Sequence, residues 1–360
     1  WVADMDFKIP QCVQKALHEY VDFGAIGYYR IPDGYYDAFI NWEKKQFNFE
    51  VKREWLRFAP GVVAAFNWMI QMLTKKGDAV IVMTPVYYPF LQAVTNNERK
   101  LITSDLVNEN GNYTIDFDDF EKKIVDNDVK AFILCSPHNP VGRVWRKEEL
   151  KEMLEICHRH HVYVISDEIH QDFVFGDKKQ TPSYLMTEHW DEILTITAPS
   201  KTFNLAGLVG SYHIVYNSYL RDRLMEAEKC SHYNSANVLS ISALMGAYTK
   251  EGAEWVDELR EVLTQNVDYA YTYITTHFEG VSVAKAQGTY MLYLDCSGWL
   301  KEHPEMTMDD LIRAGIAVGV VWQDGRPFMN PNTIRMNLAV PHALVKEAMD
   351  RLDKYVFNAK

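Results

Sequence analysis

A lysine between two hydroxyl side chains, Lys201, follows the apolar segment 193–197 within the sequence Ala-Pro-Ser-Lys-Thr-Phe-Asn. Burial disfavours an ammonium ion and lowers the pKa of a lysine, and the neutral amine is a nucleophile toward a carbonyl carbon. This segment is therefore a candidate for covalent catalysis. Taken alone, Ser-Lys-Thr is more typical of an exposed loop.

Two other polar groups also follow apolar segments. Asp167 and Glu168 end the run 162–166. A carboxylate at such a strand end can meet a cation or a protonated ring nitrogen, although for the dipeptide alone a plain helix N-cap is the better interpretation. Asn139 lies in a turn with a proline on each side, which predicts a side-chain amide held outward as a rigid donor, or simply a tight turn.

Backbone groups and aromatic rings supply weaker signals. Gly61 precedes a helical pattern that begins with Val62 and Val63, and a glycine turn before a helix leaves backbone N–H groups that can bind a phosphate. Tyr87, in Thr-Pro-Val-Tyr-Tyr-Pro, could stack on a planar ligand or belong to the core.

The elements that must position these groups alternate along the chain. Short runs that are apolar on both faces predict buried strands at residues 79–83, 131–135, 162–165, 193–197 and 212–216. Between two of them, residues 147–161 carry apolar side chains at helical spacing. Continuous apolar strands separated by amphipathic helices predict a largely parallel sheet covered on both faces, with ligand-binding groups at the carboxyl ends of its strands.

The pattern changes after about residue 220. The later segments predict a smaller α+β domain: a helix near 235–264, a strand at 289–294, a helix near 308–314, a strand at 333–338 and a helix near 343–355. We therefore expect a large domain at residues 26–255, and a small domain formed by residues 1–25 and 256–360.

Composition narrows the class of protein. The 360 residues are 48% hydrophobic, which excludes a disordered chain. The formal net charge of −12 gives no sign of binding to nucleic acid or to an anionic membrane. The five cysteines are dispersed and form no CxxC pair, so we expect neither a disulfide framework nor a metal site. No apolar run reaches the length of a membrane span, and we expect a soluble, cytoplasmic protein.

The order of these motifs resembles that of the fold-type I, class I and II aminotransferase superfamily of pyridoxal-phosphate (PLP) enzymes. More narrowly, the sequence is similar to the cystathionine β-lyase, or carbon–sulfur β-lyase, branch. That branch is suggested by the segments 1–7, 136–145, 166–170 and 198–204. The resemblance implies an α/β, PLP-dependent transferase-like large domain of the aspartate aminotransferase type, with helices on both faces of a mostly parallel sheet, plus a smaller α+β domain.

The resemblance also implies roles for single residues around the cofactor ring. Lys201 would hold PLP as a Schiff base and later act as general base at the substrate Cα. Asp167 would pair with the pyridine N–H, Asn139 would donate to the O3′ oxygen, and Tyr87 would stack on the ring. His170 stands where the family usually has a tyrosine near O3′, and its protonation state near neutral pH is open at this point.

For the phosphate, the resemblance implies a backbone cradle with one hydroxyl. The residues concerned are Gly61, Val62, Val63 and Ser200. Many aminotransferases add an arginine eight residues after the Schiff-base lysine, but here that position is Val209. The phosphate would then depend more on the helix dipole and hydroxyl groups.

Two further residues would contact the substrate. Arg335 matches the arginine that binds the substrate α-carboxylate bidentately. Tyr28 matches the tyrosine that reaches across a dimer interface toward the neighbouring cofactor and substrate, with Tyr29 as the competing choice. The resemblance thus implies a homodimer with shared active sites.

The implied reaction is β-elimination from L-cystathionine or a related cysteine S-conjugate, which yields pyruvate, ammonia and a thiol. An aminotransferase that acts on an amino acid and a 2-oxo acid is the main alternative, because both reactions pass through loss of the Cα proton. A PLP-binding regulator with secondary lyase activity is a third. In each case the expected ligand is a small amino acid, with no nucleic acid or membrane partner.

Overall fold

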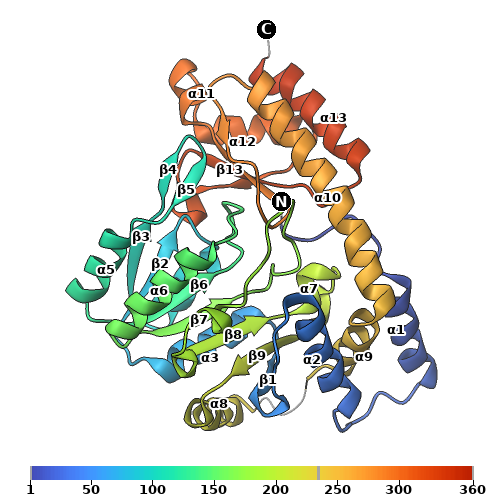
Figure 1. The fold of residues 1–360 in the computed structure, drawn as a ribbon. Helices are drawn as coiled ribbons and strands as arrows, with labels where there is room; N and C mark the ends of the chain where they lie inside the picture. The colour runs from blue at the N-terminus through green and yellow to red at the C-terminus, as the bar shows by residue number, and fades with distance from the viewer. Residues whose placement is uncertain (1, 233–235, 359–360) are drawn as a thin grey trace.

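The computed structural model describes residues 2–232 and 236–358 (Figure 1). Trp1, which begins one of the motifs above, and residue 235, where the long helix was expected to start, lie outside the described residues. Within the described ranges, no helix combines the length and the apolar character needed to cross a membrane.

A seven-stranded sheet forms the centre of the larger part of the molecule, in the order β1-β9-β8-β7-β6-β2-β3. Its strands are β1 (Leu56–Ala59), β2 (Ala79–Thr84), β3 (Lys100–Asp105), β6 (Val129–Cys135), β7 (Tyr163–Asp167), β8 (Ile193–Thr197) and β9 (Ser211–Val215). Strands β3, β2, β6, β7 and β8 are parallel, whereas β9 pairs antiparallel with both β8 and β1. The predicted α/β class and mostly parallel sheet are confirmed.

Helices cover both faces of this sheet, which explains why its central strands are largely buried on both faces. Side chains alternate along β2: Ile81 and Met83 join one buried cluster, while Val80 and Val82 join another on the opposite face. The surrounding helices are α1 (Gln11–Phe23), α2 (Asp33–Phe47), α3 (Val62–Leu73), α4 (Tyr88–Asn96), α5 (Phe117–Asp126), α6 (Lys147–Arg159), α8 (Ser218–Cys230) and α9 (Val238–Ala247).

A second, antiparallel sheet has the order β10-β11-β13-β12 and its own buried cluster (Figure 1). Its strands are β10 (Ser282–Val283), β11 (Met291–Asp295), β12 (Gln323–Asp324) and β13 (Thr333–Asn337). The helices near it are α10 (Lys250–His277), α11 (Ser297–Glu302), α12 (Met308–Ala317) and α13 (His342–Leu352). A hairpin, β4 (Val107–Glu109) and β5 (Asn112–Thr114), extends from the larger part toward it.

The prediction of one long helix near 235–264 is wrong in one respect, because the structure has two helices there and the first, α9, ends at Ala247. A second helix, α10, begins at Lys250, and the Thr249 hydroxyl caps it by accepting a hydrogen bond from the Gly252 amide at 3.1 Å. The turn is tight, since a Cβ on Gly252 would lie 1.8 Å from the Ala247 carbonyl oxygen. The expected domain limit at residue 255 falls inside α10, which is one continuous helix.

Candidate active site

A cavity of about 420 Å³ lies at the carboxyl ends of the parallel strands. Ten of the predicted site residues line it: Gly61, Val62, Val63, Tyr87, Asn139, Asp167, His170, Ser200, Lys201 and Arg335. Tyr28 does not, because its side chain is fully exposed elsewhere on the chain. A second cavity, of about 520 Å³, shares just Val2 and Asp4 with the first and contains none of the predicted residues.

Lys201 reaches the cavity from α7 (Pro199–Thr202), a single helical turn that begins two residues after β8 ends. Its Nζ donates a hydrogen bond to the Ala3 carbonyl at 3.2 Å. Burial lowers the pKa of Lys201; Asp4 opposes that shift, and the Arg335 charge adds to it. The structure therefore places a mostly buried amine, rather than an exposed loop lysine, in the cavity.

Asp167 is the last residue of β7 and pairs in register with Cys135 at the end of β6. One carboxylate oxygen, Oδ1, accepts a hydrogen bond from the Ile169 amide at 3.1 Å. Burial raises the pKa of Asp167 to about 7. Among the described residues no cation forms an ion pair with it, so a cationic ligand group would offset the cost of ionising this carboxyl.

His170 is neutral near pH 7. Burial lowers its pKa to about 3, and the Lys201 and Arg335 charges add to the shift. Tyr87 keeps its hydroxyl proton, since burial and the Asp167 charge raise its pKa to about 12. The Tyr87 amide donates to the Asn139 carbonyl at 3.0 Å, which fixes this ring relative to the turn that carries the asparagine.

Arg335 projects from the second sheet and contacts the turn that follows β6 of the first sheet. Its Nη1 donates to Asn139 Oδ1 at 3.1 Å, its Nη2 donates to Gln323 Oε1, and its guanidinium lies 5.0 Å from the centre of the Phe328 ring. Because Asn139 accepts through its oxygen, its NH₂ group is the part that can donate to a ligand. Burial lowers the pKa of Arg335 to about 10, so it remains a cation at neutral pH.

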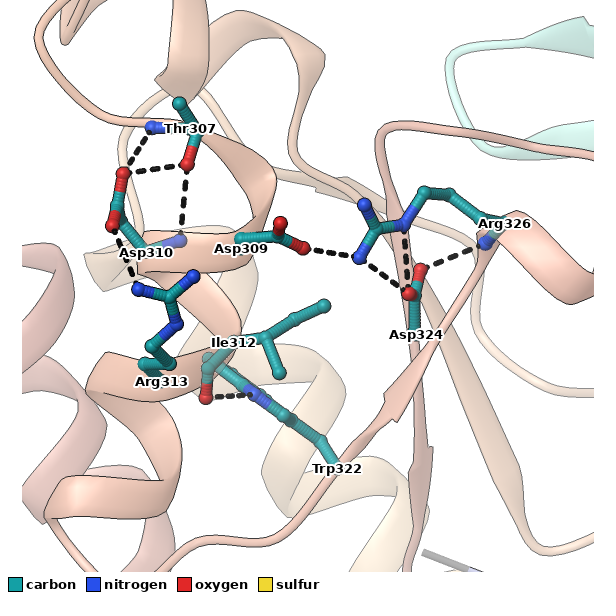
Figure 2. A network of polar contacts seen from close by, with 8 residues as sticks. All are labelled: Thr307, Asp309, Asp310, Ile312, Arg313, Trp322, Asp324 and Arg326. Atoms are coloured by element: carbon teal, nitrogen blue, oxygen red, sulfur yellow. Dashed lines mark hydrogen bonds and ion pairs between the residues drawn. The ribbon is translucent and has the colours of Figure 1, made fainter.

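The segment that supplies both Gln323 and Phe328 is itself held by charged side chains (Figure 2). Arg326 Nε donates to Asp324 Oδ2 at 2.7 Å, and the Arg326 amide donates to Asp324 Oδ1 at 2.9 Å. The same guanidinium pairs with Asp309 in the first turn of α12. This cluster connects α12 to β12 beside the contacts of Arg335.

The first turn of α3 faces the cavity with its backbone N–H groups available. Gly61 has φ +90°, a conformation that favours glycine, and among the described side chains none caps this 12-residue helix. Such a helix end attracts a phosphate. Val209, eight residues after Lys201, lines the same cavity with φ +54° and adds no charge, so the polar groups near this helix end are the Ser200 hydroxyl and backbone N–H groups.

Sequence reasoning missed several residues of this cavity. Gln323 pairs in register with Arg335, but β12 has just two residues and leaves no periodic pattern. The Ala3 carbonyl accepts from Lys201 and also from the Tyr290 hydroxyl at 2.8 Å, a contact between residues 287 positions apart. These contacts arise from tertiary packing between segments far apart in the sequence, which local sequence patterns do not encode.

The fold and this cavity are those of the aminotransferase class I and II family, and the chain belongs to it, since the family model matches residues 3–352. The chain is 37% identical over 300 residues to a cystathionine beta-lyase, PatB, of Bacillus subtilis, which covers 83% of this chain and 77% of the relative.

Two solved structures are similar over nearly the whole chain. Cystalysin from Treponema denticola, whose structure contains a pyridoxal 5′-phosphate cofactor, has a TM-score of 0.93 and 32% identity, and covers 100% of this chain and 91% of that one. A PLP-bound C-S lyase from Staphylococcus hominis has a TM-score of 0.92 and 33% identity, and covers 98% of this chain and 90% of that one.

Proposed function

We propose that this chain is a PLP-dependent carbon–sulfur β-lyase that acts on L-cystathionine or related cysteine S-conjugates and releases a thiol, pyruvate and ammonia. The observation that carries the proposal is the meeting of Lys201, Asp167 and Arg335 in one cavity, in a chain similar to named lyases. Those relatives do not favour the aminotransferase alternative.

The residues fit the cofactor on the chain's own chemistry. Asp167 is a buried carboxyl that forms no ion pair within the described chain, which suits a protonated ring nitrogen. The N-terminus of α3 and Ser200 suit the phosphate, Tyr87 suits the ring face, and Lys201 is the amine that would hold the aldehyde carbon. When bound, PLP supplies an electron sink for the charge left on Cα after deprotonation.

The remaining steps belong to protein side chains. Arg335 would bind the substrate α-carboxylate with its planar guanidinium, which orients the Cα–H bond toward Lys201. Burial favours the neutral Lys201 amine, which can accept the Cα proton at Nζ. The Cβ–S bond then breaks, the sulfur leaves as a thiolate, and water converts the remaining three-carbon fragment to pyruvate and ammonia.

Product analysis tests this function. Purified protein supplied with PLP and L-cystathionine should release pyruvate and a free thiol, and Lys201→Ala should abolish the release. A separate incubation with an amino acid and a 2-oxo acid should form little new amino acid. Formation of a new amino acid without pyruvate from cystathionine would establish the aminotransferase instead, and pyruvate release by Lys201→Ala would refute the role of that lysine.

The proposed homodimer rests on Tyr28 and its neighbours. The side chain of Tyr28 is fully exposed, and Phe23 and Ile26 expose 75% and 60% of their surface nearby in the sequence. Tyr29, the competing choice, donates a hydrogen bond to the Ala236 carbonyl of its own chain. This difference supports Tyr28 as the residue that reaches the neighbouring cavity.

Hybrid complementation tests the shared site. Lys201→Ala and Tyr28→Phe homodimers should each be impaired. After random mixing in equal amounts, about half of the dimers are mixed and each has one intact site, so the mixture should recover up to about a quarter of wild-type activity. A monomer in analytical ultracentrifugation, or mixed dimers without recovered activity, would contradict the proposal.

All five cysteines are unpaired, which supports a reducing, cytoplasmic location.

A further inference from the structure

Asp172 lies five residues after Asp167, and its buried carboxylate joins separate elements of the fold. The Thr202 hydroxyl donates to Asp172 Oδ2 at 2.7 Å, and the indole N–H of Trp42, on α2, donates to Oδ1 at 3.2 Å. The three side chains are at most 3% exposed. A carboxylate this deeply buried is stable only with such donors, so the contacts hold one another in place.

A third contact comes from α10, the helix that runs from the larger sheet's helices to the second sheet (Figure 1). Arg260 Nε donates to the main-chain oxygen of Asp172 at 2.7 Å, and its Nη2 lies 3.9 Å from the carboxylate. Burial raises the pKa of Asp172, while Thr202, Arg260 and Trp42 act against that shift. Asp172 therefore connects α2, α7 and α10.

Thr202 is the residue next to Lys201, and α7 is one helical turn. The backbone of α7 contributes few hydrogen bonds. The Phe203 amide donates to the Pro199 carbonyl at 2.9 Å, and the Leu205 amide donates to the Ser200 carbonyl at 2.9 Å. A single turn has little stability of its own. The bond from Thr202 to Asp172 is therefore a side-chain contact that fixes the turn itself, whereas Asn204, beyond the turn, is held separately by hydrogen bonds with Met5 and Phe7.

We propose that Asp172 is a positioning residue for the lyase reaction: through Thr202 it fixes the helical turn that presents Lys201, and through Arg260 it ties that turn to α10. The inference rests on the proposed function for its catalytic consequence, but not for its structural one. Arg335 contacts a different set of residues, so loosening α7 should slow proton transfer while leaving substrate binding nearly intact.

The first test replaces the hydroxyl and uses the holoenzyme. Thr202→Val should lower kcat about 10-fold with KM changed less than about 2-fold, because small displacements of a catalytic group are costly to the rate. Thr202→Ser keeps the donor and should restore kcat. The matched control is Thr195→Val, which removes a buried hydroxyl bonded to the Tyr216 hydroxyl at 2.9 Å on β8, away from α7, and should leave kcat unchanged.

Hydrogen exchange gives a readout that needs no turnover. The amides of Phe203 and Leu205 should exchange faster in Thr202→Val than in the wild type, Thr202→Ser or Thr195→Val. If Thr202→Val fails to fold, Thr202→Ala, which removes the same hydroxyl, carries the same expectations for exchange and kcat. A wild type that releases no pyruvate would refute the proposed function alone. Unchanged exchange at these two amides, equal kcat in the two valine variants, or no rescue by Thr202→Ser would refute the positioning role.

Discussion

Asp167→Asn isolates the cost of burying a carboxyl at the end of β7. In the structure, burial raises the pKa of Asp167 from its ordinary value of 3.8 to about 7. Each pKa unit corresponds to about 1.4 kcal/mol, so ionising Asp167 in the cofactor-free chain costs on the order of 4 kcal/mol relative to the unfolded chain. Asparagine has nearly the same shape and carries no such cost.

The direction in which Asp167 changes the free energy of unfolding with pH follows from the number of protons that the folded and unfolded chains bind. Between pH 4 and pH 7 the folded chain keeps the Asp167 proton while the unfolded chain has lost it, so this residue makes stability fall as pH rises. From pH 5.5 to pH 8 the free energy of unfolding of the cofactor-free wild type should fall by about 2 kcal/mol relative to Asp167→Asn. Urea denaturation of both proteins at the two pH values measures this difference.

Without cofactor, the ionised carboxylate makes the wild type less stable than Asp167→Asn at higher pH, whereas in PLP binding the wild type should have the advantage. The ring N–H cation offsets the ionised carboxylate, so the wild type should bind PLP about 10- to 100-fold more tightly than Asp167→Asn, as expected for loss of a charge-assisted hydrogen bond. An absorbance titration with PLP provides the affinities. Parallel changes of the two urea midpoints with pH, or equal PLP affinities, would refute the reasoning.

Three other substitutions, one of them with a matched control variant, test the substrate arginine, the segment beside it and a buried ion pair. Arg335→Lys keeps a cation but loses the planar fork, so kcat/KM for a cysteine S-conjugate should fall about 10- to 100-fold, mainly through KM. Arg326→Gln opens the cluster of Figure 2 and should raise KM a few-fold, whereas Arg313→Gln, which breaks a separate pair on α12, should not. Both carboxylate oxygens of Glu149 accept hydrogen bonds from the buried Arg143 guanidinium, so Glu149→Ala leaves that charge without its carboxylate partner. Urea denaturation should show that the free energy of unfolding falls by about 3–5 kcal/mol, and a fall below about 1 kcal/mol would contradict this.

The parallel strands were predictable because helices cover both of their faces. Every residue of β2, β8 and β9 is buried, so the apolar runs in the sequence mark these strands closely. Strands with a polar or exposed side were missed. The edge strand β3 is exposed at both ends and alternates between buried and half-buried residues in its centre, and β1 has two half-buried residues, so neither presents a continuous apolar run.

The residues of the candidate site also fall into two groups: those at the ends of parallel strands were predictable from the sequence pattern, and those on the second sheet were not. Asp167 ends a strand of the larger sheet, and Lys201 and Asn139 each follow one. Parallel strands bring their carboxyl ends to one edge, so pattern alone could place these residues together. Arg335 lies in the middle of β13, on another sheet, where it resembles any strand residue with a long side chain. Its 3.1 Å bond to Asn139 depends on how the two sheets pack, which local periodicity does not encode. Family resemblance therefore had to supply the substrate arginine, while the elementary rules for parallel sheets suffice to place the lysine and the carboxyl.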